Sequence, residues 1–427
     1  MALIKQALIL GATAIAVSGA AAVGWGTYGP TKVPSIIAPI MAQDEPKEVV
    51  DEVWNIVQSQ YVDATFNQTD WVAVRKDFLG RKYTNRKAAY EASREMLKKL
   101  NDPYTRFMDP DEYSNMKIDT TGELSGVGIQ LAVDDKTKEL TVVAPIEDSP
   151  AFRAGIQAKD VIIKIDNEST KGMDDKRAVQ LIRGEVGSQV TLTVRRDKKE
   201  LAFPITRDRI EIHPVKYRVQ KAKGQNVGYI RLVQFSQPAI GEMEDAIRDL
   251  EKQDIQGYVL DLRSNPGGLL NASIDIARMF MDKGTIVSTV TRRGDQARKT
   301  ANNSALTRKP MVVLVDGGSA SASEILSGAL QDNSRSKVIG TKTFGKGLVQ
   351  AVLPLRSDNE QSAMAVTIAK YLTPSGRDIN KLGIEPDVKV ELTEQQRKSL
   401  SQDNKKIGTP ADAQFAKAVQ VLLSEKG

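Results

Sequence analysis

The chain has 427 residues, of which 27% are charged and 41% hydrophobic, and it carries a formal net charge of +6 at pH 7. These values are ordinary for globular proteins, so disordered and fibrous classes are excluded, and the length allows two or three domains. The charge is small and spread along the chain, without a dense basic tract interleaved with aromatics, which argues against a nucleic-acid partner.

Two scarce residue types restrict the chemistry. The sequence has no cysteine, which excludes thiol nucleophiles, disulfides and thiolate metal sites. It has one histidine, His213, so a histidine-rich zinc site is also excluded. His213 directly precedes Pro214 at the end of a strand-like run, and we interpret it as a linker residue. If the protein is a hydrolase, its general base is therefore expected not to be histidine.

The first 42 residues have the pattern of an export signal. Lys5 supplies a short positive region, residues 7–23 are apolar or small, and residues 20–22 and 41–42 offer two cleavage ends. Because the apolar run approaches the length of a membrane span, an uncleaved anchor is the alternative, and it would tether the protein to the membrane. In either case the remaining chain is predicted to be exported from the cytoplasm.

Residues 43–116 are expected to be helical. Apolar residues recur at helical spacing between positions 49 and 57, and residues 88–100 form a second amphipathic stretch. Asn101-Asp102-Pro103 ends that stretch. The sequence therefore predicts a helical region before the next change in composition.

Residues 117–208 change to short β-rich runs with two helical pieces between them, and they resemble a PDZ domain over nearly their whole length. The match rests on the glycine turn at 125–129, on Ser149-Pro150-Ala151, on residues 160–166 and on a helix that ends at 181–184. The resemblance implies capture of a peptide carboxylate by backbone N–H groups of the turn, with the peptide added to a strand edge. The turn residues are Gly126, Val127, Gly128 and Ile129. A glycine hairpin in another small β domain is the alternative.

Residues 209–427 return to alternating strands and helices, a pattern typical of an α/β core with a central sheet. Apolar strands are predicted at 227–232, 257–262 and 311–315, and helices at 241–251, 270–280 and 321–330.

A serine follows the strand at 311–315. Ser321 lies where the next helix begins, so the backbone N–H of Ala322 would point at a developing oxyanion, aided by the helix dipole. Ser321 with Glu324 also fits a capping box, which is the structural alternative for this serine.

A lysine lies twenty-five positions further on, among glycines and apolar residues. Lys346 can act as a base only if it is neutral, which requires burial or a cationic neighbour. In an extended strand Gln350 would share its face and could orient the amine. The alternative is a solvated surface lysine.

A glycine-containing turn forms the third element. Residues 261–268 follow a predicted strand, and the backbone N–H of Gly267 could approach a substrate closely. A plain left-handed turn is the alternative.

Together these three elements resemble the C-terminal processing peptidases, the tail-specific Ser-Lys protease family, over roughly residues 45–390. The match looks closest to the branch found in photosynthetic membranes. The resemblance implies that Ser321 is the nucleophile, Lys346 the general base and Gln350 the residue that orients the lysine. It also implies that Gly267 and Ala322 form the oxyanion hole.

The implied fold is a multidomain α+β chain, with a signal peptide or anchor at 1–42 and a helical region at 43–116. It continues with a PDZ domain at 117–208 and ends with an α/β protease core at 209–427.

The implied reaction is amide hydrolysis through an acyl-enzyme, without a metal or other cofactor. Its substrates would be unstructured carboxyl-terminal tails of exported or membrane-protein precursors, in the periplasm or thylakoid lumen. The photosystem II D1 precursor is one candidate.

Three rival interpretations rest on other features of the sequence. Residues 340–347 match a P-loop up to Gly347, which replaces the Ser or Thr that ligates magnesium, and a strand is expected where a P-loop needs a helix. Residues 334–337 match S-x-x-K, but its partner motifs are absent. A non-enzymatic PDZ adaptor with an inactive protease core would bind tails without cleaving them.

Arg183 ends the helix that should flank the peptide groove. It could stabilise the helix dipole as a terminal cation. Alternatively, its long charged side chain could couple tail binding to the active site, so that the PDZ domain gates cleavage.

Overall fold

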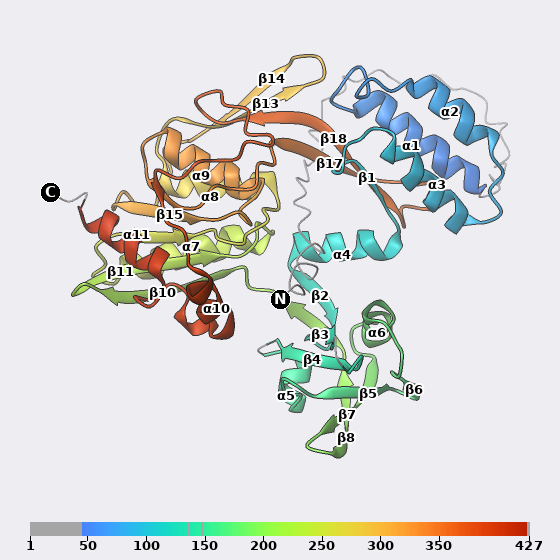
Figure 1. Ribbon diagram of the computed structural model, residues 1–427, viewed down its shortest axis with the longest axis horizontal. Coiled ribbons are helices and arrows are strands. Elements are labelled where there is room, and N and C mark those ends of the chain that lie inside the picture. Colours follow the sequence, from blue (N-terminus) through green and yellow to red (C-terminus); the bar gives the residue numbers. More distant parts are fainter. Residues whose placement is uncertain (1–44, 135–136, 147, 425–427) are drawn as a thin grey trace, which may run out of the picture. The chain divides into compact units, whose positions relative to one another are not determined.

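Figure 1 shows the computed structural model, which describes residues 45–134, 137–146 and 148–424. The chain forms two compact units, one made of Thr121–His213 and the other of the residues before and after it. The predicted signal or anchor segment, residues 1–42, lies outside the described residues. Within the described ranges, the helices all fall short of the length and apolar character that crossing a bilayer requires.

The larger unit begins with the expected helical region. It contains α1 Pro46–Gln60, α2 Trp71–Gly80, α3 Arg86–Lys98 and α4 Pro110–Thr121, with a short strand, β1 Arg106–Met108, before α4. The side chain of Asp70 caps α2 by accepting from the Ala73 N–H, and Asn85 caps α3 in the same way. The valines at helical spacing in α1 are buried, as their periodicity predicts.

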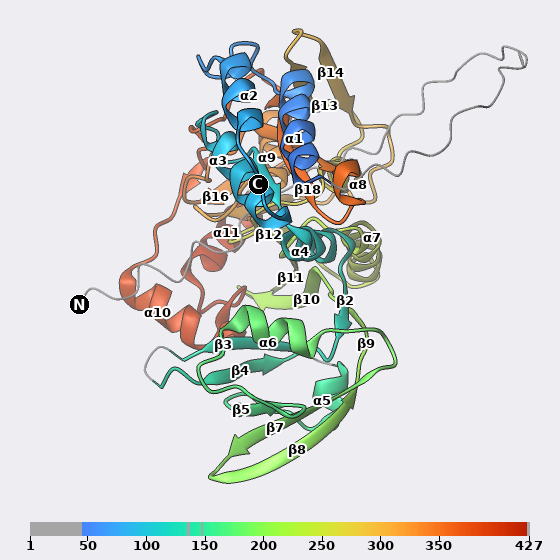
Figure 2. The ribbon, with the colours of Figure 1, turned by 90° about the vertical axis from the view of Figure 1, so that its right-hand side faces the viewer.

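The smaller unit is a β-rich domain with two helices. Its sheet has the order β3-β4-β5-β7-β8, which Figure 2 shows, while β6 pairs with β5 and β2 pairs with β9. The strands are β2 Glu123–Gly126, β3 Ile129–Val133, β4 Leu140–Pro145, β5 Val161–Ile165, β6 Glu168–Ser169, β7 Gln189–Arg196, β8 Lys199–Thr206 and β9 Asp208–Glu211, and the helices are α5 Pro150–Ala154 and α6 Asp175–Ile182. The predicted strands and helices of this region are therefore present.

The α/β core of the larger unit is built on a six-stranded sheet with the order β10-β11-β12-β15-β16-β19. All neighbours after the antiparallel β10–β11 pair are parallel. The strands are β10 Val215–Ala222, β11 Gln225–Leu232, β12 Tyr258–Asp261, β15 Met311–Val315, β16 Lys337–Gly340 and β19 Val388–Lys389. The three predicted core strands are among them, because apolar runs of this kind are buried on both faces.

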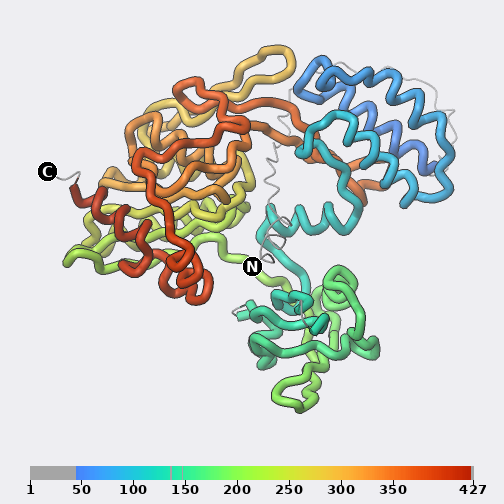
Figure 3. Tube along the Cα trace, in the orientation of Figure 1, coloured from blue at the N-terminus to red at the C-terminus, as the bar shows by residue number. Residues whose placement is uncertain are grey.

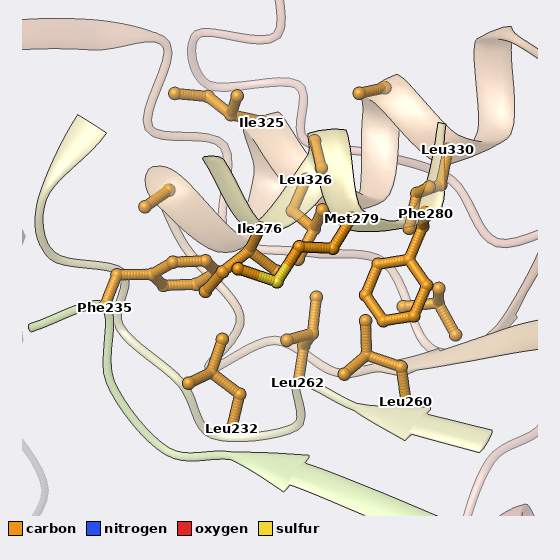
Figure 4. Packing of buried hydrophobic residues seen from close by; sticks show 14 of the residues in the cluster. Leu232, Phe235, Leu260, Leu262, Ile276, Met279, Phe280, Ile325, Leu326 and Leu330 are labelled. Atoms are coloured by element: carbon orange, nitrogen blue, oxygen red, sulfur yellow. The ribbon is translucent and has the colours of Figure 1, made fainter. Parts of the chain in front are cut away.

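Helices cover both faces of this sheet. On one face lie α7 Pro238–Glu251, α8 Leu270–Phe280 and α9 Ala322–Asp332, whose apolar side chains pack on Leu260 and Leu262 of β12 and the loop after it. Figure 4 shows this packing, with Phe280 of α8 and Leu326 of α9 pointing toward the sheet. On the other face α11 Ala413–Ser424 packs against Val259 and its neighbours. Helix α10 Glu394–Gln402 precedes α11.

A second sheet joins the core to the N-terminal helices. Its long strand β18 Ala363–Leu372 pairs with β17 Leu348–Pro354, with β1 at its start and with β13 Thr285–Thr291 at its end, and β14 Gln296–Thr300 adds to β13. Buried side chains of α1 and α3 pack with Met364 and Val366 of β18. The trace in Figure 3 follows this hairpin between the two regions. Residues 363–372 therefore place the helical region beside the core.

The C-terminal helix α11 should be essential to the stability of the core. Phe415 is 0% exposed and packs edge-on against Tyr229 with ring centroids 5.6 Å apart. We expect Phe415→Ala to lower the free energy of unfolding by about 3–5 kcal/mol, because it leaves a cavity under the sheet. Urea unfolding followed by circular dichroism measures this change.

Phe344→Ala is the matched control, since Phe344 is 56% exposed. Its effect should stay within about 0.5 kcal/mol. If Phe415→Ala lowered the free energy of unfolding as little as Phe344→Ala does, α11 would not belong to the folded core.

Candidate active site

Ser321 occupies a strained turn between β15 and α9. Its backbone has φ 54° and ψ −110°, a conformation that few residues other than glycine adopt. The residue is 6% exposed. Ala322 follows as the first residue of α9, where a backbone N–H has no partner within the helix and the positive end of the helix dipole lies. The turn thus presents a hydroxyl beside a donor suited to an oxyanion.

Glu324 links this turn to the loop that carries Lys346. Its carboxylate accepts hydrogen bonds from the backbone N–H groups of Ser321 at 2.8 Å, Gly345 at 2.7 Å and Lys346 at 2.8 Å. The Thr343 hydroxyl also donates to it, at 2.5 Å. Burial raises the pKa of Glu324 above its usual value of 4.5, although these hydrogen bonds favour the ionised form. The capping-box spacing at Ser321 pointed to this residue, but it gave no sign of the contacts to the lysine loop.

Lys346 is buried, which excludes the solvated-lysine alternative: it is 2% exposed, and its amine nitrogen lies 4.9 Å from the centroid of the Tyr104 ring. Burial lowers the pKa of Lys346 from 10.5 to about 7, and the Arg106 guanidinium adds to this lowering. The carboxylates of Asp102 and Glu324 oppose it. The amine therefore loses its proton near neutral pH.

Gln350 is buried as well, at 1% exposure, and its Nε2 donates to the Thr367 hydroxyl at 3.3 Å. The simple alternation along one strand that suggested a shared face does not hold, however. Lys346 precedes β17, which begins at Leu348, and the register with β18 shifts between Val349 and Gln350.

The P-loop alternative for residues 340–347 is not supported, because the strand β17 follows this segment where a P-loop would need a helix.

The glycine turn contains two adjacent glycines with positive φ, 105° at Gly267 and 139° at Gly268. The Gly267 N–H donates to the Asn265 side chain at 2.9 Å, so the predicted oxyanion role would require this N–H to change partner. A Cβ on Gly268 would lie 2.2 Å from the Phe235 carbonyl oxygen, so no other residue fits there.

A small cavity lies beside Ser321. Gly268 lines it, whereas Gly267 does not, and the remaining lining residues are mostly apolar: Leu270, Ser321, Ala322, Ile325, Leu348, Val349 and Tyr371. The cavity therefore brings together the serine, the helix N-terminus and the second glycine of the turn.

A buried ionic network supports the base of the glycine turn. Arg263 donates to Asp261 at 2.5 Å and to Asp412, just before α11, at 2.7 Å. The Tyr229 hydroxyl donates to Asp261 at 2.7 Å. Burial alone would raise the pKa of Asp261, but the Arg263 charge and these hydrogen bonds hold it below its usual value. The turn is thereby fixed to the start of α11, a helix that was not among those predicted.

The glycine turn of the smaller unit joins β2 to β3. Gly128 has φ 80°, and a Cβ there would lie 2.2 Å from Cβ of Ser149, so glycine is required. Val127 is buried at 1% exposure, and Gly126 and Ile129 end and begin the two strands. The predicted peptide-binding turn thus has the backbone shape that the glycines indicate.

Arg183 directly follows α6 and is partly buried. The last carbonyl groups of this helix accept hydrogen bonds from another arginine: Arg207 donates to Leu181 at 2.9 Å and to Ile182 at 2.8 Å.

His213 lies in the loop between β9 and β10, where the chain passes from one unit to the other, as expected of a linker residue.

Comparison with known proteins decides the family. Residues 226–390 match peptidase family S41 and residues 141–196 match a PDZ domain. The carboxyl-terminal-processing protease of Synechocystis sp. is 44% identical over 385 residues, which cover 90% of this chain and 88% of that protein. The chain belongs to the carboxyl-terminal-processing proteases of family S41. Its fold class, a PDZ domain with a helical segment and an α/β protease core, is thereby confirmed.

Two further relatives extend this assignment. Carboxyl-terminal-processing peptidase 3, chloroplastic, of Arabidopsis thaliana is 39% identical over 352 residues, which cover 79% of this chain and 67% of that protein. Among solved structures, the photosystem II D1 C-terminal processing protease is 34% identical with a TM-score of 0.56, and the match covers 87% of this chain and 98% of that one.

Replacing Glu324 should loosen the link between the two loops of this protease. Glu324→Gln keeps the size of the side chain but turns an NH2 group toward N–H and O–H donors, so buried donors lose their acceptor. We expect a loss of about 2–3 kcal/mol in the free energy of unfolding, together with a strong fall in peptidase activity. Urea unfolding and cleavage of an unfolded protein substrate measure the two effects.

Glu244→Gln is the control, because Glu244 is an exposed partner of Arg248 on α7. It should change neither quantity appreciably. A Glu324→Gln protein with parental stability and activity would contradict the linking role.

Proposed function

We propose that this protease is a serine endopeptidase that cleaves near the carboxyl termini of exported or membrane-protein precursors, with Ser321 as nucleophile and Lys346 as general base. The observation that carries the proposal is the buried amine of Lys346, whose pKa is lowered to about 7 and whose loop is tied through Glu324 to the Ser321 turn. A neutral lysine base together with a serine nucleophile supplies both groups that acyl transfer requires.

In the first half of the reaction the neutral Lys346 amine takes the proton of the Ser321 hydroxyl while Oγ attacks the carbonyl carbon of the scissile amide. The oxyanion that forms accepts hydrogen bonds from the Ala322 N–H and from an N–H of the glycine turn, for which Gly267 was predicted. The resulting Lys346 ammonium then gives its proton to the departing amine as the C–N bond breaks. An acyl-enzyme on Ser321 remains.

In the second half a water molecule gives a proton to Lys346 and attacks the acyl carbonyl carbon. Return of that proton to Ser321 Oγ releases the shortened substrate and restores both groups. Gln350 contributes by orienting the amine. The steps use side chains and backbone donors of this chain together with one water molecule.

The smaller unit suits the capture of a substrate tail. The turn Gly126 to Ile129 would bind the terminal carboxylate through its backbone N–H groups, and an extended tail would pair with a neighbouring strand edge. A gating role for Arg183, which directly follows α6 and is partly buried, belongs to this proposal.

The relatives support the proposed compartment and substrate. Relatives from Arabidopsis thaliana and Tetradesmus obliquus are named chloroplastic, and the similar solved structure is a photosystem II D1 C-terminal processing protease. We accordingly place this chain in the periplasm or thylakoid lumen, delivered or anchored by its first 42 residues. The D1 precursor is one candidate substrate.

Loss of either member of the pair should abolish cleavage. We expect Ser321→Ala and Lys346→Ala each to lower kcat by about a thousandfold or more, and the double variant to be little worse, because the two groups act as one unit. The assay incubates each variant with an extract of exported proteins and maps new carboxyl termini by mass spectrometry.

Two controls accompany this test. Lys342→Ala removes an exposed lysine of the same loop that pairs with Glu385, and His213→Ala removes the sole histidine. Both should stay active. Substantial turnover by Lys346→Ala would rule out the lysine base, and a parental protein that binds tails without cleaving any would favour the adaptor interpretation.

Cleavage should depend on pH through Lys346. Below about pH 7 the neutral fraction of an amine with a pKa of about 7 falls roughly tenfold per pH unit, so kcat/KM should fall by that factor and level off above about pH 8. Single-turnover measurements from pH 5.5 to 9, with a peptide that does not titrate in this range, give the profile. A rate independent of pH between 6 and 9 would contradict a lysine base.

A further inference from the structure

A cluster of two threonines and one aspartate lies next to the predicted catalytic residues. Asp102 and Thr105 belong to the short segment between α3 and β1, while Thr367 lies in the middle of β18. Thr105 is 3% exposed and Thr367 is 0% exposed. The cluster therefore joins the N-terminal helical region to the strand that pairs with β17.

The carboxylate of Asp102 accepts hydrogen bonds from both threonine hydroxyls. Its Oδ2 accepts from Thr367 Oγ1 at 2.8 Å and from Thr105 Oγ1 at 2.7 Å, and its Oδ1 accepts from the Tyr104 N–H at 2.9 Å. The Thr367 N–H donates to Thr105 Oγ1 at 3.1 Å, which holds the two strands in register here. Asp102 is thus the acceptor toward which both threonine hydroxyls are oriented.

These hydrogen bonds determine the orientation of the Gln350 side-chain amide. A threonine hydroxyl has one proton to donate, and Thr367 gives it to Asp102, so its lone pairs are left to accept. They accept a hydrogen bond from Gln350 Nε2 at 3.3 Å, and the Thr105 hydroxyl lies within hydrogen-bond distance of them as well, at 3.2 Å. The NH2 end of the Gln350 amide therefore points toward Thr367, and its carbonyl end is directed away, where it can serve as an acceptor for an amine.

The same segment also touches the lysine. Tyr104, which lies between the two cluster members Asp102 and Thr105, places its ring 4.9 Å from the amine nitrogen of Lys346. The charged groups that act on this amine come from three elements: Asp102 from the segment after α3, Arg106 from β1 and Glu324 from α9. The Asp102 charge favours the protonated amine, whereas the Arg106 charge disfavours it.

We propose that Asp102 is a positioning residue for the catalytic pair, which acts through the hydroxyl of Thr367 to fix the amide of Gln350 and thereby the amine of Lys346. The inference rests on the proposed roles of Lys346 and Gln350 and adds a chain of contacts, Asp102 to Thr367 to Gln350, that originates in the N-terminal helical region. Neither Asp102 nor Thr367 is required to touch the substrate.

The threonine is tested by a matched pair of variants. Thr367→Val keeps the branched shape but deletes the hydroxyl, and it should lower kcat about 10- to 100-fold with KM within about threefold, as misplacement of a catalytic group does. Thr367→Ser keeps the hydroxyl and should retain kcat within about threefold. A valine variant with parental kcat, or a serine variant as impaired as the valine variant, would overturn the proposal.

The aspartate is tested by Asp102→Asn, which should lower both the maximal kcat and the pH midpoint of the kcat–pH profile. The asparagine turns an NH2 group toward the threonine hydroxyls, so the maximal kcat should fall at least tenfold. Removing the negative charge lowers the pKa of Lys346 further, so the midpoint of the kcat–pH profile should shift to lower pH. A purely structural role predicts lower activity with an unmoved midpoint, and that result would overturn the proposal.

Asp70→Asn is the control, because Asp70 caps α2 in the same region and asparagine caps equally well. It should alter neither kcat nor the midpoint. Should Asp102→Asn not fold, as judged by its melting curve, the Thr367 pair decides alone. An active Lys346→Ala variant would instead refute the proposed function itself, so the two failures are distinguishable.

Discussion

The carboxylate of Glu324 holds together two loops that are far apart in the sequence, and the geometry of the site depends on it. One loop ends β15 and carries Ser321 in a backbone conformation that is unfavourable on its own. The other precedes β17 and carries Lys346. Because Glu324 is buried and accepts from donors on both loops, breaking the contact would leave several polar groups without partners in the core. The strain at Ser321 is sustained by this contact.

Strand β18 connects the N-terminal helical region to the same site. Its first residues pair with β1, its residues 363–370 pair with β17, and Thr367 in its middle bonds to the segment after α3. The surroundings of Lys346 therefore come from regions on both sides of the smaller unit in the chain, with Tyr104 and Arg106 from one and Glu324 from the other. This arrangement explains why the helical region forms one compact unit with the core rather than a separate domain.

Much of this could be predicted from the sequence. Apolar runs at 227–232 and 311–315 indicated buried strands, and the serine and lysine motifs indicated the residues that the fold encloses. What escaped prediction depends on contacts between distant positions: Asp102 with Thr367, Glu324 with Lys346, and Arg207 with the end of α6. Helix α11 was not predicted, although its buried residues Phe415, Ala418, Val419 and Leu422 recur at helical spacing. It is held by packing under the sheet and by the ion pair of Asp412 before it. Whether Gly267 or Gly268 supplies the N–H of the oxyanion hole likewise depends on a local contact, because the Gly267 N–H already donates to the side chain of Asn265.

Burial of Lys346 also has a consequence for the thermodynamics of folding. Its pKa is about 7 in the folded protein against 10.5 when exposed, so between these values the unfolded chain holds a proton that the folded chain has released. Folding at neutral pH is therefore coupled to proton release by this group, and its contribution to the stability of the fold increases with pH across this window. Below pH 7 the folded protein must hold a charged amine in its interior, and the contribution of Lys346 is lowest there. Mildly alkaline pH thus favours, at this residue, both burial of the side chain and the reactive form of the base.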